Sequence, residues 1–418
     1  MFPAFSTALS ALNAESAAID VTGNNLANLN TTGFKSSQVE FSDLMSQSLG
    51  VGQNAGQVGL GVGQIQTQAI YTQGSITNTN APLNAAIQGN GFFVVNDPST
   101  NQQLYTRDGN FQLSSTGQLE TANGQLVQGW TATNGTVNAN GAPGNITLPM
   151  GATIPAVATT TMSMAVNLNS QVTTGSANAT FTAPIQVYDS LGASHTLTAT
   201  FTQTASNAWS YSVSIPAADL KGTGTPAPLA TGSLTFDSSG NLTSPAAGSP
   251  VAVKITGLAD GAADQNITWN LFGSDGTGLV TQFAQTSDLS STQQDGRAPG
   301  QITSVGLQNG GTIVATYSNG QQSTVGQLAV ASIGNPSTLV SVGQNNLQAS
   351  AATAPAAIGA ANSGGRGQIL GGALESSTAD MAAEFTNLLS FERSDQAAAR
   401  VITTSDQILQ ETVNLIHA

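Results

Sequence analysis

The sequence has no cysteine and few charged residues, and basic residues are the scarcest. Without cysteine, a disulfide framework, a thiolate nucleophile and a Cys-ligated metal site are excluded. Only 7% of the 418 residues are charged, and the eight Lys and Arg residues are scattered, whereas binding nucleic acid needs clustered cations to neutralise phosphates. The net charge of −14 is dilute over this length. We therefore expect no nucleic-acid partner.

Long hydrophobic runs are also missing. A transmembrane helix needs about 20 nearly continuous apolar residues, and the apolar runs of this chain are only a few residues long. A secretory signal peptide begins with a basic segment, whereas the first basic residue here is Lys35. The sequence therefore predicts no membrane span and no cleaved signal peptide, so any export would use another route.

Side chains that carry chemistry are scarce as well. His195 and His417 are the only histidines, and His195 lies in an alternating segment that we interpret as ordinary sheet surface. Residues 237–241 match the start of a calcium loop but lack the glycine and bidentate glutamate that complete it. The glycines of residues 59–63 lack the flanking strand and helix of a dinucleotide loop. We predict no catalytic, cofactor-binding or metal site, and therefore no enzyme.

Glutamate is absent between Glu120 and Glu375. Because glutamate favours helices and is depleted in strands, this gap predicts a β-rich middle between two helical ends. The middle alternates Thr, Ser and aliphatic residues with period two, as in residues 196–201 and 209–213, between Gly, Asn and Asp turns. Residues 111–119 and 234–242 share the spacing of a hairpin around a type I turn, and the Asn-Gly pairs at 309–310 and 319–320 predict type I′ turns around a strand at 312–317.

Each end of the chain carries residues at alternating steps of three and four, which is a heptad stripe. The first helix is expected to start at Pro3 and to fray or bend beyond Val21, because Gly23 lies inside it. A capping box of Ser377 and Asp380 is expected to open the second helix, which runs to the end of the chain.

The two stripes have no obvious core of their own, because Gly-rich stretches at 50–63 and 359–372 flank them. We predict that the helices pair with each other and that neighbouring chains bury the remaining apolar surface. The residues expected at this polymerisation interface are Phe5, Leu9, Leu12, Ile19, Leu26, Phe385, Leu388, Ile402, Leu409, Val413 and Ile416.

Residues 21–35 resemble the N-terminal signature of the bacterial flagellar rod and hook protein family. Residues 86–95, 105–111 and 373–409 are similar to further segments of that family. Residues 152–288, 310–320 and 326–331 resemble its hook members in particular, because the shorter rod members lack a large β insertion. The signature residues are Gly23, Asn24, Asn25, Ala27, Asn28, Thr32, Gly33, Phe34 and Lys35.

The resemblance implies a structural subunit of the flagellar hook, a curved and flexible tube that transmits torque from the rod to the filament. It implies partners as well: further copies of the chain, the distal rod protein, the hook cap or scaffold protein, the hook–filament junction protein and the flagellar type III export apparatus. The expected location is extracellular, in the hook and basal body.

We therefore predict an α+β multi-domain protein. The terminal helices, in residues 1–30 and 374–418, are expected to form a helical coiled-coil domain. Residues 31–71 and 359–373 connect it to an inner β domain of residues 72–151 and 289–358. An outer β domain of residues 152–288 is nested inside, and both are expected to be hairpin, sandwich or barrel-like.

Other functions stay open at this point. The chain could be the distal rod protein or another axial protein of the flagellum. A surface adhesin would share the acidic middle rich in Thr, Asn and Gly. A hydrolase on a β scaffold would need clustered carboxylates, and Asp260, Asp264 and Asp275 are the only candidates close together in sequence.

Overall fold

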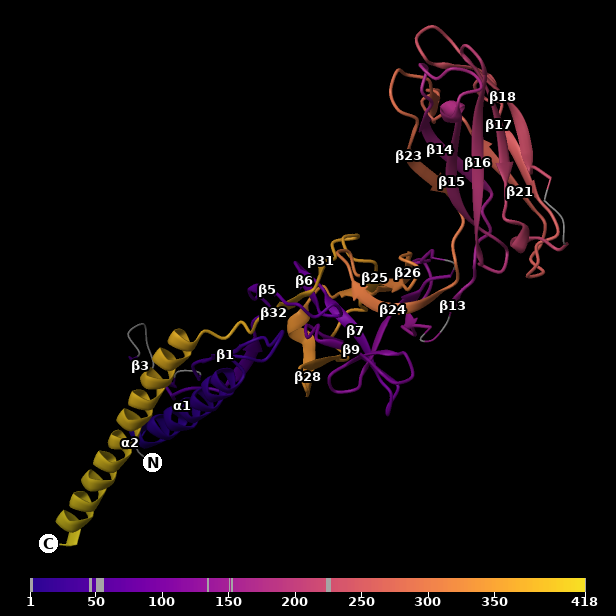
Figure 1. Cartoon of the computed structure of the whole chain (residues 1–418). Coiled ribbons are helices and arrows are strands. Elements are labelled where there is room, and N and C mark those ends of the chain that lie inside the picture. The colour runs from indigo at the N-terminus through magenta and orange to yellow at the C-terminus, as the bar shows by residue number, and fades with distance from the viewer. Residues whose placement is uncertain are drawn as a thin grey trace. The chain divides into compact units, whose positions relative to one another are not determined.

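The computed structural model describes residues 3–44, 47–49, 56–133, 135–149, 151, 153–222 and 227–417 (Figure 1). Two compact units divide the chain. The helix-bearing unit combines Met1–Met150, Ser304–Thr316 and Gln322–Ala418, and the sandwich unit combines Gly151–Thr303 and Tyr317–Gln321. The sandwich unit is thus an insertion in the sequence of the helix-bearing unit. None of the helices among the described residues is both long and apolar enough to cross a membrane.

The first helix, α1 (Pro3–Ala27), is continuous and longer than expected. The predicted fraying beyond Val21 is wrong, because the helix continues through Gly23 for four more residues. Two buried polar side chains hold this last part: the Thr22 hydroxyl donates to the carbonyl of Ala18 at 2.8 Å, and Asn25 bonds the backbone of Ser37. These contacts offset the roughly 1 kcal/mol that a glycine costs inside a helix.

The second helix, α2 (Met381–His417), runs over 37 residues to the end of the described chain. Its N-cap is Asp380, whose carboxylate accepts a hydrogen bond from the amide of Ala383 at 2.9 Å. The predicted capping box, with Ser377 as the N-cap, is therefore wrong, because the N-cap lies three residues later. The Ser377 hydroxyl instead accepts from the amide of Ala379, before the helix begins.

Short strands make up most of the helix-bearing unit, and β24 and β25 cross the boundary between the two units along the chain. Its elements are β1 (Ser37–Glu40), β2 (Gln47–Leu49), β3 (Gly56–Val58), β4 (Gln66–Ala69), β5 (Ile76–Asn78), β6 (Ala85–Gln88), β7 (Phe92–Asp97), β8 (Gln102–Thr106), β9 (Phe111–Leu113), β10 (Leu119–Thr121), β11 (Leu126–Thr131), β12 (Gly144–Asn145), β24 (Gly300–Leu307), β25 (Thr312–Tyr317), β26 (Gln322–Leu328), β27 (Val330–Ser332), η3 (Pro336–Thr338), β28 (Leu339–Gly343), β29 (Asn346–Ala349), β30 (Ala357–Gly359), β31 (Gln368–Gly371) and β32 (Ala373–Glu375).

The main sheet of this unit has the strand order β24-β25-β26-β11-β7-β8-β29-β28. Its central strand β7 is buried on both faces, which explains why four apolar residues follow one another there. Phe92 packs in a cluster with Tyr105 and Trp130, while the adjacent Phe93 contacts the ring of Phe111 edge-on at 5.0 Å. Two short pairs, β5 with β32 and β6 with β31, attach the segment before α2 to this part of the chain.

The sandwich unit contains the longest strands. Its elements are β13 (Thr153–Ile154), β14 (Thr161–Asn167), η1 (Ala177–Ala179), β15 (Thr180–Tyr188), β16 (Ser194–Ala205), β17 (Ala208–Ser214), η2 (Ala217–Asp219), β18 (Ala230–Phe236), β19 (Leu242–Ser244), β20 (Val251–Ile255), β21 (Gln265–Asn270), β22 (Val280–Thr281) and β23 (Asp288–Gln294).

Two five-stranded sheets face each other in this unit. One has the order β15-β16-β17-β18-β19, and the other has the order β20-β21-β14-β22, with β23 also pairing β14. Every second residue points inward, and the core centres on aromatic side chains. Trp269 of the second sheet contacts Tyr211 edge-on at 5.3 Å and Phe201 at 6.2 Å, both on the first sheet.

The predicted hairpins are present, but two turn types differ. β9 pairs β10 and β18 pairs β19 around the turns expected at 111–119 and 234–242. The strand expected at 312–317 is β25, with the bounds that the two Asn-Gly pairs indicated. The type I′ assignment of these pairs is wrong, because that turn needs a positive φ at both central residues and Asn309 and Asn319 do not have one.

Gly109 gives a direct test of the packing in the helix-bearing unit. A Cβ atom at this position would overlap the backbone carbonyl oxygen of Ala85, which cannot move without breaking its strand. We expect Gly109→Ala to destabilise the protein by about 3 kcal/mol or more, measured by denaturant unfolding of the full chain. Gly144→Ala is the matched control, since nothing lies within 4 Å of its Cβ position, and it should change stability by less than about 0.5 kcal/mol. Equal stability of the two variants would contradict this packing.

Candidate assembly site

The terminal helices pack side by side and run in opposite directions (Figure 1). Asn25, near the end of α1, bonds Glu384 at the start of α2, and Glu15 lies near Asp395 further down both helices. The pairing of the two helices that the stripes predicted is therefore observed. The α1 residues buried within the chain carry small or polar side chains, namely Ala8, Ala14, Ala18, Thr22 and Asn25.

The apolar stripes lie beside this buried face and are only partly covered. On α1, Leu9 is 45% exposed, while Phe5, Leu12, Ile19 and Leu26 are half-buried. On α2, Phe385 is 50% and Val413 51% exposed, while Leu388, Ile402 and Leu409 are half-buried. The side chain of Ile416 lies outside the described residues. The single chain thus leaves apolar surface uncovered on both helices, and its place in a polymer interface stays a prediction.

The helix α2 is longer than its partner, with 37 residues against 25. Counted from the Asn25–Glu384 contact, α1 continues for 22 residues to Pro3 and α2 for 33 residues to His417, so α2 extends 11 residues, or roughly 16 Å, beyond α1. In this extension Ile408 is 54% exposed and Leu415 78% exposed. The end of α2 therefore has the least intrachain cover of the whole helical pair.

Two acidic side chains lie where the helices meet. Burial raises the pKa of Glu15, and the carboxylate of Asp395 raises it further. Burial also raises the pKa of Glu384, with a smaller contribution from Asp380, although the amide of Asn25 donates to Glu384 at 2.9 Å and opposes the shift. A raised pKa in the folded state stabilises pairing at acidic pH, and this stabilisation is lost as the pH rises through the raised value. At neutral pH these charges therefore weaken the intrachain helix pair.

Asn25 of the family signature joins three segments. Its amide nitrogen donates to the carbonyl of Ser37 at 2.8 Å and to Glu384, and its carbonyl oxygen accepts from the amide of Ser37 at 3.0 Å. One side chain thus ties α1 to the start of β1 and to α2. Aspartate could not donate these bonds, which gives a physical reason for an amide at this position.

The rest of the signature forms the turn that leaves α1. The Asn28 amide donates to the carbonyl of Asn24 at 2.9 Å, and the Thr31 hydroxyl donates to Asn28 at 3.0 Å. Gly33 has a φ of +68°, and a Cβ there would lie 2.5 Å from the carbonyl carbon of Arg107, so both conformation and space require glycine. Gly23 and Ala27 are exposed, and no contact among the described residues explains them.

A buried ion-pair cluster lies just beyond this turn. Glu375, at the end of β32, is 1% exposed. One carboxylate oxygen accepts from Lys35 at 2.7 Å and from the amide of Gly74 at 2.9 Å, and the other accepts from Arg107 at 3.0 Å. Burial lowers the pKa of Lys35, although the bond to Glu375 opposes this. Lys35 comes from the signature, Arg107 from the segment after β8, and Glu375 from the approach to α2, so the cluster joins three distant parts of the sequence.

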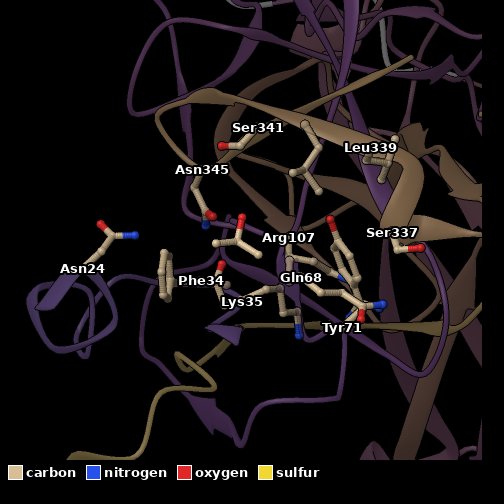
Figure 2. A pocket seen from close by; sticks show the side chains of 15 residues that line it. Asn24, Phe34, Lys35, Gln68, Tyr71, Arg107, Ser337, Leu339, Ser341 and Asn345 are labelled. Carbon is tan, nitrogen blue, oxygen red and sulfur yellow. The ribbon is translucent and has the colours of Figure 1, made fainter. Parts of the chain in front are cut away.

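A pocket of about 320 Å³ opens beside this cluster (Figure 2). The end of α1, the β1 and β4 pair, and the β28–β29 hairpin supply its lining. Figure 2 shows Phe34 and Tyr71 at its sides, and Asn345, which donates to the carbonyl of Thr32 at 2.7 Å. Its two charged residues, Lys35 and Arg107, are already bound to Glu375. The lining therefore has the character of a polar contact surface and holds no nucleophile paired with a base.

The interpretation of His195 as sheet surface is wrong, because its ring is only about 6% exposed. It lies on the same face of β16 as Leu197 and Phe201, so the alternation that places those residues in the core also buries His195. The sequence pattern could therefore have predicted its burial. The ring contacts Asp189 through Nε2 at 3.0 Å and Asp219 through Nδ1 at 3.2 Å.

Glu375→Gln tests the buried cluster. The variant keeps the shape of the side chain but leaves Lys35 and Arg107 buried without their anion, so we expect a loss of about 3–5 kcal/mol in the free energy of unfolding. Denaturant unfolding of the full chain measures it. Glu40→Gln changes an exposed glutamate of β1 and should be nearly neutral. If Glu375→Gln were as stable as Glu40→Gln, the cluster would have no structural role.

Glu15→Gln tests the acidic contact between the helices. Removing the charge near Asp395 should stabilise the helix pair at neutral pH, by less than about 1 kcal/mol because the group is partly exposed. The gain should shrink as the pH falls through the raised pKa of Glu15, where the side chain itself takes up a proton, and should vanish below 4.5, the ordinary pKa of glutamate. Thermal melting of the helical circular dichroism signal at neutral and acidic pH measures both effects. Asp20→Asn, an exposed change on the same helix, should show neither.

Models of flagellar protein families match most of the chain. The family described as "Flagella basal body rod protein" matches residues 5–35, and "Flagellar hook protein FlgE/F/G D1 domain" matches residues 86–174. "Flagellar basal body protein FlaE D2 domain" matches residues 167–297, and "Flagellar basal body rod FlgEFG protein C-terminal" matches residues 370–415.

Individual relatives match nearly from end to end. The flagellar hook protein FlgE of Salmonella typhimurium is 34% identical over 425 residues, which cover 98% of this chain and 99% of that protein. FlgE of Escherichia coli is 34% identical over 423 residues, with coverage of 99% and 100%. The crystal structure of Helicobacter pylori flagellar hook protein FlgE2 covers 65% of this chain and 93% of its own, with 14% identity and a TM-score of 0.47. The 34% identity over nearly the whole length of the first two proteins confirms the family resemblance that residues 21–35 indicated. The chain therefore belongs to the family of flagellar hook proteins FlgE.

Proposed function

We propose that the protein is the structural subunit of the bacterial flagellar hook and that it polymerises through α1 and α2. Its family is a family of hook structural proteins. The main support for the role of the helices is the apolar surface that stays exposed on both helices of a single chain, for example at Leu9 on α1 and Val413 on α2. Apolar residues at heptad spacing are the pattern that helices bury against other helices.

In the proposed polymer the helices form a coiled-coil inner wall and the β domains form the outer layers. The helical domain comprises residues 1–30 and 374–418, joined through segments 31–71 and 359–373 to an inner β domain of residues 72–151 and 289–358. Residues 152–288 form the outer domain. The extension of α2 beyond α1 supports this arrangement, because its exposed apolar residues need a partner that the same chain does not provide.

The composition suits a tube that bends. Only 7% of the residues are charged, so like subunits can approach one another without strong repulsion. The many Ser, Thr, Asn and Gln side chains favour hydrogen-bonded and hydrated outer contacts, each of them weak. Weak outer contacts can exchange partners while the helical wall stays intact, which is what a universal joint between rod and filament requires.

The proposed location is outside the cell, in the hook and its junction with the basal body. Further copies of the chain are the main partner. The distal rod protein, the hook cap or scaffold protein, the hook–filament junction protein and the flagellar type III export apparatus follow as partners. Export without a cleaved signal peptide is part of the same proposal.

The hydrolase alternative has no support in the turns that hold its candidate carboxylates. Asp260 accepts from the amide of Ala262 at 2.9 Å, Asp264 from Gly257 at 3.0 Å, and Asp275 from Thr277 at 3.0 Å. Asx-type turns of this kind are common structural features. The family itself is structural and not enzymatic.

Leu9→Asp tests the polymerisation surface. Because Leu9 is 45% exposed, the variant chain should fold and be made normally, whereas an aspartate in the interface would bury an unpaired charge at every subunit contact. That costs more than the 2–5 kcal/mol typical of replacing a buried leucine by alanine. We expect no hooks in electron micrographs and no swimming halo.

Phe283→Asp is the matched control. It introduces the same charge at an apolar residue of equal exposure, 46%, but in the sandwich unit. Hooks should still form in this strain. Normal hooks from the Leu9→Asp strain would show that α1 does not supply the interface.

A further inference from the structure

Three segments of the sandwich unit converge on the buried imidazole of His195, the second residue of β16. The turn after β15 supplies Asp189, η2 supplies Asp219, and the loop between β20 and β21 supplies Asp260. Asp189 is fully buried, whereas the side chain of Asp260 is 30% exposed. The cluster therefore has a buried floor and one side open to solvent.

Three of these side chains place one potential ligand atom each close to the other two. Nε2 of His195 lies 3.0 Å from Oδ2 of Asp189 and 3.8 Å from Oδ2 of Asp260, and the three atoms lie within 4.8 Å of one another. In a tetrahedral site with bonds of about 2.0–2.1 Å, ligand atoms are roughly 3.3–3.4 Å apart. These two separations lie on either side of this value, and the third, between the two carboxylates, is at most 4.8 Å, so binding of one ion would require the three side chains to adjust.

The other heteroatom of each side chain is held by the protein. Oδ1 of Asp189 accepts from the amides of Leu191 at 2.8 Å and Ala193 at 2.9 Å, and Oδ1 of Asp260 accepts from Ala262 at 2.9 Å. Nδ1 of His195 faces Oδ2 of Asp219 at 3.2 Å, although without the alignment of a hydrogen bond. A small rotation of either side chain would give the outer-shell contact between carboxylate and imidazole that orients metal ligands.

Hydrogen bonding within the protein leaves this cluster incompletely satisfied. A single N–H at Nε2 can serve only one of the two carboxylates that face it, and buried Nδ1 makes no well-formed hydrogen bond despite its proximity to Asp219. Among the described residues, His195 is the sole ion-pair partner of the three aspartates, and the side chains of Asp189 and Asp260 also lie within hydrogen-bond reach of each other, so these groups have to share protons in the absence of a cation. A divalent cation would balance the charge of the aspartates and use the ligand atoms that now compete for protons.

We propose that Asp189, His195 and Asp260 bind one divalent transition-metal ion of the zinc type, with Asp219 orienting the histidine. One imidazole nitrogen and two carboxylate oxygens form a donor set that zinc accepts, and water can complete the coordination at the side that Asp260 leaves open. This proposal departs from the sequence-based prediction of no metal site. Asp189 and His195 are six residues apart in the β15–β16 hairpin, but Asp260 lies in a distant loop, so the three ligands together form no spacing motif.

The position of the site suggests what the ion would do. The turn that holds Asp189 includes Gly192, whose Cβ position meets Pro299 and lies 2.8 Å from Ala156. These residues flank the bridge between Val157 and Arg297, where the chain enters and leaves the sandwich unit. A bound ion would join the turn after β15, the start of β16 and the β20–β21 loop beside this entrance and stiffen that end of the sandwich.

Titration of the full-length, chelator-treated chain with zinc chloride, followed by calorimetry and by the thermal midpoint, tests the proposal. All samples carry His417→Asn, which removes the only other imidazole. We expect one zinc per chain and a midpoint that rises with zinc concentration. Cobalt chloride should give the intense visible absorption of a tetrahedral site. Asp260→Asn, an exposed change, should weaken zinc binding more than about 100-fold, and Asp219→Asn by about 10–100-fold.

Asp264→Asn is the matched control. This residue lies on the same loop as Asp260 but accepts from the amide of Gly257, and its change should leave zinc affinity within about twofold. Zinc binding unaffected by Asp260→Asn would overturn the proposal. So would a thermal midpoint that depends on pH but does not respond to zinc, which would identify the cluster as a protonated histidine latch. Neither result bears on hook assembly, so the proposed function is tested separately.

Discussion

The carboxylate of Glu375 determines how the terminal helices connect to the rest of the helix-bearing unit. It is buried, and it binds Lys35, which follows α1, and Arg107, which follows β8. Removing three charges from water carries a large desolvation cost. The ion pairs and hydrogen bonds of the cluster offset it only while every partner is present. A backbone hydrogen bond strengthens this connection, because the amide of Gly33 donates to the carbonyl of Glu375 at 2.8 Å. The exit from α1 and the approach to α2 are therefore fixed at one point.

In the proposed hook this junction is also the path along which load passes from the helices to the β domains. Short charge-assisted hydrogen bonds resist displacement better than neutral ones. Asn25, within α1, adds a second connection, since it binds both the start of β1 and Glu384 of α2. Flexibility of the tube then has to come from contacts between subunits, because the junction within each subunit is held by buried charges.

The sequence predicts the elements better than the contacts between them. The distribution of glutamate locates both helices, and period-two alternation locates the strands and even explains the buried position of His195. The Glu375 cluster was not predictable, because Lys35 and Glu375 are 340 positions apart and no local pattern relates them. The buried face of α1 was missed for another reason. The largest apolar residues attract attention, yet Ala8, Ala14 and Ala18 are the ones that the chain itself buries.

That offset between the alanine face and the leucine stripe bears on how assembly is driven. Alanines bury little apolar area, so they stabilise the intrachain pair weakly at about 25 cal/mol per Å². Burial and the neighbouring Asp395 raise the pKa of Glu15, so that its charged form weakens the pair further at neutral pH. The larger residues, Leu9 and Phe385 among them, stay available. In the proposed hook, a helix pair built in this way would gain most of its hydrophobic stabilisation from neighbouring subunits, so that helix order and polymerisation would reinforce each other.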